Sequence, residues 1–143
     1  GRIVAVSVSE RKGERKSPVP QATLVPDHGV ERDAHAGPGH RQVSLLASES
    51  IGKMREKGLA VGPGDFAENV TVEGIDLVAL KVGDRLRIGE ALVEISQIGK
   101  ECHDRCAIYF QAGDCVMPRE GVFARVVHGG AVAPGDPVSK AGG

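Results

Sequence analysis

The sequence predicts a mostly β domain that forms a closed or partly open β-barrel with one or two short helices. Glycine supplies 20 of the 143 residues, against a usual share of about 7%. These glycines follow no repeat, so they indicate many turns and close backbone approaches. Apolar residues recur in short alternating runs, which are typical of short strands. Short strands need closure to hide their edges, and a barrel is the simplest way to provide it.

Length and composition indicate one domain, over residues 1–143 with a core at about 22–140. The net charge is −1 and the chain has no Trp, one Tyr and three Phe, which argues against nucleic acid and anionic membranes as partners. No apolar run reaches 18 residues, so no membrane-spanning helix is predicted. Residues 2–8 lack the pattern of a signal peptide, and the cysteine count is odd. A reducing, cytoplasmic location is therefore expected, while the oligomeric state stays open.

The N-terminal part predicts two strands separated by a loop. Residues 3–8 alternate around valines and form the opening strand. Residues 9–20 are charged and contain two prolines, which predicts a solvated, mobile loop that buries little and is dispensable to the fold. Residues 22–30 form the second strand, interrupted by Pro26 and Gly29.

One helix is clear, over residues 49–57. Ser48 is the expected N-cap, and Gly58 the expected C-terminal stop. Ile51 and Met54 fall on its inner face.

The remaining strands follow from alternation and from one hairpin turn. Gly89-Glu90 is a Gly-X pair suited to a two-residue hairpin. The predicted strands are 42–47, 68–73, 84–88, 91–98, 121–128 and 136–140.

The tripeptide X-Gly-Asp occurs four times, at residues 63–65, 82–84, 112–114 and 134–136. Its irregular spacing is not that of a repeat architecture. We interpret the four copies as turns, in which Gly supplies the dihedral angle and Asp bonds the backbone, rather than as a shared metal site.

The three cysteines lie within 14 residues, at Cys102, Cys106 and Cys115. Cationic neighbours lower a thiol's pKa, and the thiolate is both the nucleophile and the metal ligand. The cationic residues nearby in the sequence are Lys100, His103, Arg105 and Arg119.

Three interpretations of this segment compete. In the first, the cysteines are small buried residues near a turn. In the second, Cys102, His103, Cys106 and Cys115 bind zinc, although their spacing does not match paired C-x2-C knuckles. The third, which we prefer, is a reactive or metal-ligating thiolate.

Two polar segments precede strands and suit the mouth of a barrel. Residues 32–42 are rich in glycine, with Asp33, His35 and Arg41 as candidate ligand-binding groups. Glu68 and Asn69 begin the strand at 68–73, as turn and cap residues or as groups that support the site.

Taken together, these motifs resemble the MOSC domain, the module found at the C-terminus of molybdenum cofactor sulfurases. The resemblance covers residues about 29–138, and the chain looks like a stand-alone, single-domain member. The matching pieces are Asp33-Ala34-His35-Ala36-Gly37, Arg41-Gln42-Val43-Ser44-Leu45-Leu46, residues 68–77, residues 82–89, the cysteine segment and residues 117–126.

The resemblance implies a MOSC, pyruvate-kinase-barrel-like fold and a role with the molybdopterin form of the molybdenum cofactor or with sulfur delivery. It places the family's cysteine on Cys102, with Cys106 as a rival because residues 105–108 resemble the family's reductase branch. Cys102 is then the thiolate that ligates molybdenum or holds a persulfide. Lys100 and His103 assist it, and the cofactor-binding candidates are Asp33, His35, Arg41, Asn69, Arg119 and Arg125.

The sequence departs from the family pattern at two positions. Arg32 and Ala67 stand where glycines are expected, before Asp33 and before Glu68. Both departures reshape the expected mouth of the barrel.

Four functions remain open at this point. The leading one is a protein that binds the cofactor or carries sulfane sulfur, with a sulfur-donor or sulfur-acceptor enzyme as partner. The alternatives are a molybdenum-dependent reductase of N-hydroxylated compounds, a non-catalytic docking or carrier barrel, and a thiol redox protein that joins Cys102 to Cys106. No pyridoxal-phosphate-binding desulfurase fits in 143 residues.

Overall fold

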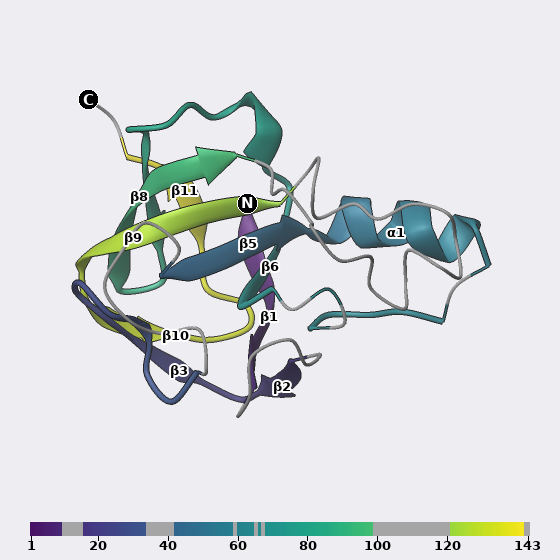
Figure 1. The fold of residues 1–143 in the computed structure, drawn as a ribbon, viewed down its shortest axis with the longest axis horizontal. Coiled ribbons are helices and arrows are strands. Elements are labelled where there is room, and N and C mark those ends of the chain that lie inside the picture. The colour runs from purple at the N-terminus through teal and green to yellow at the C-terminus, as the bar shows by residue number, and fades with distance from the viewer. Residues whose placement is uncertain are drawn as a thin grey trace.

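The computed structural model describes residues 1–9, 16–33, 42–58, 60–64, 66, 68–98 and 121–141. Within them the chain forms two sheets, one α-helix and one 3-10 helix (Figure 1). The elements, in chain order, are β1 (Arg2–Val8), β2 (Ser17–Val19), β3 (Ala22–Val25), β4 (Gly29–Val30), β5 (Val43–Ala47), α1 (Ser48–Glu56), β6 (Val70–Glu73), η1 (Leu77–Ala79), β7 (Arg85–Ile88), β8 (Ala91–Ile98), β9 (Val122–His128), β10 (Gly130–Val132) and β11 (Val138–Lys140).

The larger sheet has eight strands in the order β11-β7-β8-β9-β5-β6-β1-β2, and the smaller has the order β10-β3-β4. Every pairing is antiparallel except that of β5 with β6. The parallel pair is possible because α1 carries the chain back between the two strands.

The larger sheet curls until β1 meets the residues just before β11. Ile3 donates its N–H to the Asp136 carbonyl at 2.8 Å and accepts one from Gly135 at 2.8 Å, and Arg2 bridges Pro137. No continuous ladder joins the two strands, so the sheet forms a partly open barrel. The predicted mostly β, barrel-like fold class is confirmed.

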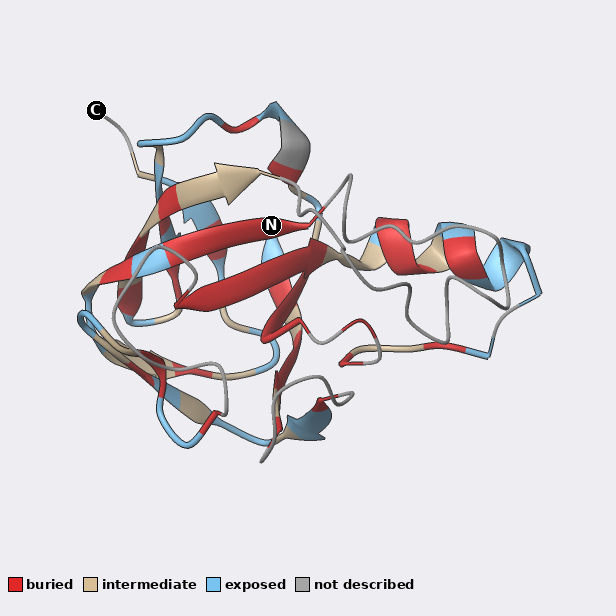
Figure 2. Ribbon diagram, viewed as in Figure 1, coloured by how far each residue is buried: buried red, intermediate tan, exposed pale blue. Residues whose placement is uncertain are grey.

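Alternating side chains fill the interior of this barrel. Along β7, Leu86 and Ile88 are buried while Arg85 and Arg87 are exposed. The largest fully buried apolar side chains include Ile3, Leu24, Leu45, Leu86, Ile88 and Ile95. Figure 2 shows this burial running along β5, β9 and β1.

The helix α1 lies outside the barrel, beyond the end of β5 (Figure 1). Its Ile51 and Met54 join Leu46 and Phe123 in a second, smaller core, as their predicted place on the inner face requires. The helix begins at Ser48 itself and Ala47 is the N-cap, so the predicted capping role of Ser48 is wrong. Ala47 still belongs to the extended β5, which brings the helix start forward by one residue. Gly58 ends the helix with φ at +91°, as predicted.

The X-Gly-Asp tripeptides form turns wherever the structure describes them. Gly64, Gly83 and Gly135 all have positive φ. Asp84 Oδ2 accepts the Lys81 N–H at 2.9 Å, and Asp136 Oδ2 accepts the Ala133 N–H at 3.0 Å. The copy at 112–114 lies outside the described residues.

The expected solvated loop at 9–20 is wrong at both of its described ends. Ser17–Val19 forms β2 and pairs with β1, and Ser9 and Lys16 are buried. The reason is tertiary, because these residues pack against groups distant in the sequence. The strand β10 and the helix η1 were also not predicted. No described helix is long and apolar enough to cross a membrane.

Gly64 packs so closely that a side chain there would meet backbone. A Cβ at Gly64 would lie 2.2 Å from the Lys16 carbonyl oxygen, whereas one at Gly83 would meet nothing within 4 Å. Both glycines have positive φ, so an alanine at either position would adopt the left-handed backbone, which costs about 1–2 kcal/mol. We expect Gly64→Ala to lose at least about 2 kcal/mol more than Gly83→Ala in urea unfolding, because of overpacking. If both variants lost the same free energy of unfolding, the backbone around Gly64 would have to move aside for a Cβ without an energetic cost, which would contradict this prediction.

Candidate functional site

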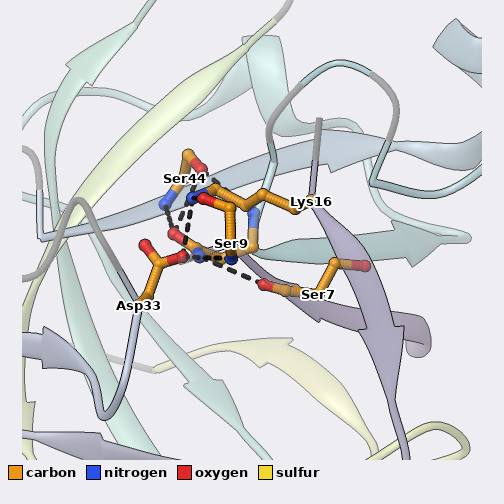
Figure 3. Close-up of polar contacts among 6 residues, drawn as sticks. Ser7, Ser9, Lys16, Asp33 and Ser44 are labelled. Atoms are coloured by element: carbon orange, nitrogen blue, oxygen red, sulfur yellow. Dashed lines mark hydrogen bonds and ion pairs between the residues drawn. The ribbon is translucent and has the colours of Figure 1, made fainter. Parts of the chain in front are cut away.

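A buried polar network lies at the end of the barrel where β1 finishes and β6 begins (Figure 3). Its members come from segments far apart in the sequence. They are Ser7 and Ser9 near the end of β1, Lys16 before β2, Asp33 after β4, Ser44 in β5 and Asn69 before β6.

An ion pair between Lys16 and Asp33 stands at the centre of this network. Lys16 Nζ lies 2.7 Å from Asp33 Oδ1, and both side chains are 0% exposed. The same oxygen accepts the Ser9 N–H at 3.0 Å, and Lys16 Nζ also donates to Ser9 Oγ at 3.2 Å. Figure 3 shows these three side chains converging on one point.

The surroundings of Asp33 keep its carboxylate ionised. Burial alone raises its pKa, but hydrogen bonds from Lys16, Ser9 and Asn69, together with the charge of Lys16, outweigh burial and hold the pKa below its ordinary value. A carboxylate with these donors is a poor proton acceptor at neutral pH. Asp33 therefore positions its neighbours. Its contribution to stability is present above its ordinary pKa and is lost as pH falls through the lowered one.

Asn69 extends the network from Asp33 to β5 and β1. Its Oδ1 accepts the Ser44 N–H at 3.1 Å and the Ser44 hydroxyl at 3.2 Å. Its Nδ2 donates to the Ser7 carbonyl at 3.2 Å. The amide is thus held on both sides, and the two strands that flank β6 are tied together.

The Ser7 hydroxyl is the exception in this network. Within the described residues, its Oγ is the buried side-chain polar atom that has no hydrogen-bond partner. The hydroxyl points away from Asp33 (Figure 3) and lies next to Gly64, where a Cβ would approach it to 3.1 Å.

Glu68 forms a separate buried cradle beside Asn69. Its Oε1 accepts the N–H groups of Gly64 at 3.0 Å and of Phe66 at 3.3 Å, and its Oε2 accepts the Thr71 hydroxyl at 2.9 Å. Burial raises the pKa of Glu68 above its ordinary value, and the hydrogen bonds only partly oppose that effect. The cradle holds the backbone N–H groups of Gly64 and Phe66 in place just before the Asn69 segment.

The structure brings two of the predicted site residues together. Asp33 and Asn69, from motifs well apart in the sequence, both bond the end of β1, through the Ser9 N–H and the Ser7 carbonyl respectively. Arg125 lies exposed on β9, where it pairs with Glu94 Oε2 at 3.3 Å. The predicted residues His35, Arg41, Lys100, Cys102, His103, Cys106 and Arg119, with Cys115 of the zinc interpretation, lie outside the described part of the chain.

Sequence reasoning missed Lys16 and Ser44. Lys16 stands in a charged run next to Pro18, which is the pattern of a solvated loop. Ser44 is a polar residue within an otherwise apolar strand. That interruption is the feature of the sequence that could have indicated a buried hydrogen bond. No cluster of three or more His, Cys, Asp or Glu side chains suited to a metal is found among the described residues.

A partly open barrel with a buried polar network at one end defines the class of this protein. The family model of the MOSC domain matches residues 31–139, about three quarters of the chain. The chain therefore belongs to the MOSC domain family. That family is associated in general with molybdenum cofactor binding and sulfur chemistry. No curated protein matches the chain.

Solved structures support the fold. The YuaD protein from Bacillus subtilis aligns with a TM-score of 0.78 at 19% identity, over 96% of this chain and 93% of that one. YiiM from Geobacillus stearothermophilus gives 0.73 at 23%, over 99% and 75%. YiiM from Escherichia coli gives 0.68 at 21%, over 100% and 71%. At these identities the likeness establishes the fold alone.

The buried ion pair makes a sharp prediction for stability. Lys16→Met leaves the Asp33 carboxylate buried without its cation, and we expect a loss of about 3–5 kcal/mol in urea unfolding. Lys16→Met combined with Asp33→Asn removes both charges and keeps an acceptor for Ser9, so it should recover at least half of that loss. As a control, Lys140→Met breaks a pair with Asp84 in which the lysine is 60% exposed, and should cost less than about 1 kcal/mol. A double variant as unstable as Lys16→Met would contradict this account.

Glu68 predicts a pH dependence of the opposite sign to that of Asp33. Its folded pKa is raised above 4.5, so the folded state binds its proton more tightly and loses stability as pH rises from 4.5 through the raised value. Glu68→Gln keeps the acceptor for Gly64 and removes this loss. The stability of the variant relative to the original chain should therefore increase between pH 4.5 and 8, by about 1.4 kcal/mol per unit of pKa shift. Thermal unfolding of both proteins across this range measures the difference, and a constant difference would refute it.

Proposed function

We propose that this protein binds a molybdopterin-type molybdenum cofactor and uses Cys102 as the thiolate that ligates molybdenum or carries sulfane sulfur. The observation that carries the proposal is that Asp33 and Asn69 both bond the end of β1, since Asp33 Oδ1 accepts the Ser9 N–H at 3.0 Å and Asn69 Nδ2 donates to the Ser7 carbonyl at 3.2 Å. These contacts join residues of two family motifs in one buried network at the end of the barrel.

The described network fits a supporting role toward such a cofactor. The cofactor carries a phosphate and supplies a redox-active metal held by sulfur ligands. The ammonium group of Lys16 and the carboxamide of Asn69 are buried and bonded to Asp33, Ser9 and Ser7, so they position the segments around the cofactor and leave the phosphate to the arginines. Soft thiolate ligands suit metal–sulfur chemistry.

Each residue then has a distinct role. Asp33 positions Lys16 and Asn69 and fixes the start of the segment that carries His35. Arg41, Arg119 and Arg125 capture the phosphate, since a guanidinium bonds phosphate through two parallel N–H groups. Lys100 and His103 keep Cys102 ionised.

Three more specific functions are compatible with this proposal, and each would be recognised by a different observation. A cofactor-bound protein that reduces a hydroxylamine acts as a molybdenum-dependent reductase. A protein that passes a persulfide to a second enzyme acts as a sulfur carrier. A Cys102–Cys106 disulfide that forms and breaks readily indicates a thiol redox protein. A cytoplasmic location fits all three.

The experiment is molybdenum and pterin analysis of the protein purified from a host that makes the cofactor. We expect near-stoichiometric molybdenum in the original chain and at least a tenfold loss in Cys102→Ser. Cys106→Ser and Cys115→Ser are matched controls and should retain the metal. Mass spectrometry of the same samples detects a persulfide on Cys102. Equal loss in Cys106→Ser alone would move the assignment to the rival thiol, and absence of metal, pterin and persulfide from the original chain would refute the proposal.

A further inference from the structure

Two arginines on the outer wall of the barrel are left unpaired by the fold. Arg85 and Arg87 stand at alternate positions of β7 and are exposed, whereas Leu86 between them is buried. Both side chains therefore point outward, about 7 Å apart along the strand. Within the described part of the chain, neither guanidinium has a hydrogen bond or an ion pair. Their donors are thus available to a second molecule.

The carboxylates nearest to these arginines are already engaged elsewhere. Glu94 is directly opposite Arg85 in the β7–β8 register, but its Oε2 accepts from Arg125 at 3.3 Å. Asp84 Oδ2 pairs with Lys140 Nζ at 3.5 Å. The wall around β7 therefore carries an excess of positive charge, although the whole chain has a net charge of −1.

An exposed valine stands next to these charges, at the tip of the turn that directly precedes β7. Val82 is 67% exposed, and among the described residues it is the large hydrophobic side chain that lies open to solvent. Asp84 donates its N–H to the Lys81 carbonyl at 2.9 Å, and Gly83 donates to the Ile95 carbonyl of β8 at 2.8 Å. The turn is therefore fixed, and it presents its apolar tip before any partner arrives.

The spacing of these groups defines the partner. Side chains two positions apart in an extended chain point to one side and lie about 7 Å apart. Acidic residues at alternate positions of an extended segment therefore match Arg85 and Arg87, since each carboxylate accepts two N–H groups of one guanidinium. An apolar residue beside them contacts Val82. A nucleic acid matches less well, because its phosphates offer Val82 no apolar group and are repelled by Glu94 and Asp84.

We propose that the wall formed by β7 and the turn before it docks an extended, acidic segment of a partner protein. The segment has acidic residues at alternate positions and an apolar residue at its end. This docking goes beyond the proposed function, because it uses neither Cys102 nor the cofactor. It is tested on the protein without metal, so failure of either proposal leaves the other intact.

The test is an NMR titration of the isotope-labelled protein with the end-capped peptide Val-Thr-Glu-Thr-Glu-Thr-Val. We expect saturable shifts at β7 and the turn before it, with weaker binding at higher salt because the ion pairs are exposed. The isomer Val-Thr-Thr-Glu-Glu-Thr-Val has the same composition and charge but directs its carboxylates to opposite sides. It should bind about fivefold more weakly. Equal affinities for the two peptides, or absence of saturable shifts, would overturn the proposal.

A double variant separates local docking from net charge. Arg85→Gln with Arg87→Gln should lower the affinity for the alternating peptide about tenfold. Both side chains are exposed and unpaired within the described residues, so the melting temperature should change by less than about 3 °C. The matched control is Lys53→Gln with Lys57→Gln, which removes two exposed charges from α1 and its C-cap. The helix lies on the opposite side of the molecule from the C-terminus that follows β11 (Figure 1). The control should stay within about twofold, and an equal loss would refute the docking surface.

Val82→Thr tests the apolar contact, because threonine keeps the shape of valine and adds a hydroxyl. The affinity for the alternating peptide should fall about threefold, and an unchanged affinity would refute the role of Val82. A single-stranded oligothymidylate distinguishes the two kinds of polyanion and should bind more weakly than the peptide. Tighter binding of the oligonucleotide at this wall would overturn the proposal in favour of a nucleic acid.

Discussion

The buried ion pair between Lys16 and Asp33 is the interaction on which the rest of the structure depends. Removing two charges from water is costly, and their attraction repays that cost only if the geometry is good and the remaining donors and acceptors are satisfied. Here Ser9 completes the arrangement, since its N–H donates to Asp33 Oδ1 and its hydroxyl accepts from Lys16 Nζ. The pair forms only when the end of β1, the start of β2 and the turn after β4 are all in place. It therefore joins the small sheet to the large one.

The same network explains why two of the segments that match the MOSC domain lie together in this chain. A MOSC domain match identifies which segments correspond, and the structure explains how two of them come together. Asp33 Oδ1 accepts from both Lys16 and Ser9, so the role of Asp33 is to hold other groups in place. Asn69 bonds Ser44 of β5 and Ser7 of β1, and so fixes these two strands relative to each other. A site built in this way is organised before any ligand arrives, and preorganisation lowers the cost of binding.

Local patterns account for what the sequence predicts well. Alternation places Leu86 and Ile88 inside, and a Gly-X pair marks the β7–β8 hairpin; both signals act over a few residues. Lys16 could not be predicted, because its partner is 17 residues away and only the folded chain excludes water from the pair. The short β2 and β10 lack internal patterns and exist because a neighbouring strand accepts their hydrogen bonds. Arg32 is intermediate, since the family pattern leads one to expect glycine at this position and the backbone there has the positive φ that glycine favours.

The partial closure of the barrel has a consequence for how the chain folds as it is synthesised. In the larger sheet, β1 is covered along one edge by β6; along the other it is covered by β2 near its end and by residues 135–137 near its start. The β2 segment emerges soon after β1, and its Pro18 blunts the new edge. The start of β1 must wait until almost the whole domain has left the ribosome. Such long-range closure slows folding, and during the delay half of one strand edge stays open to pairing with other nascent chains.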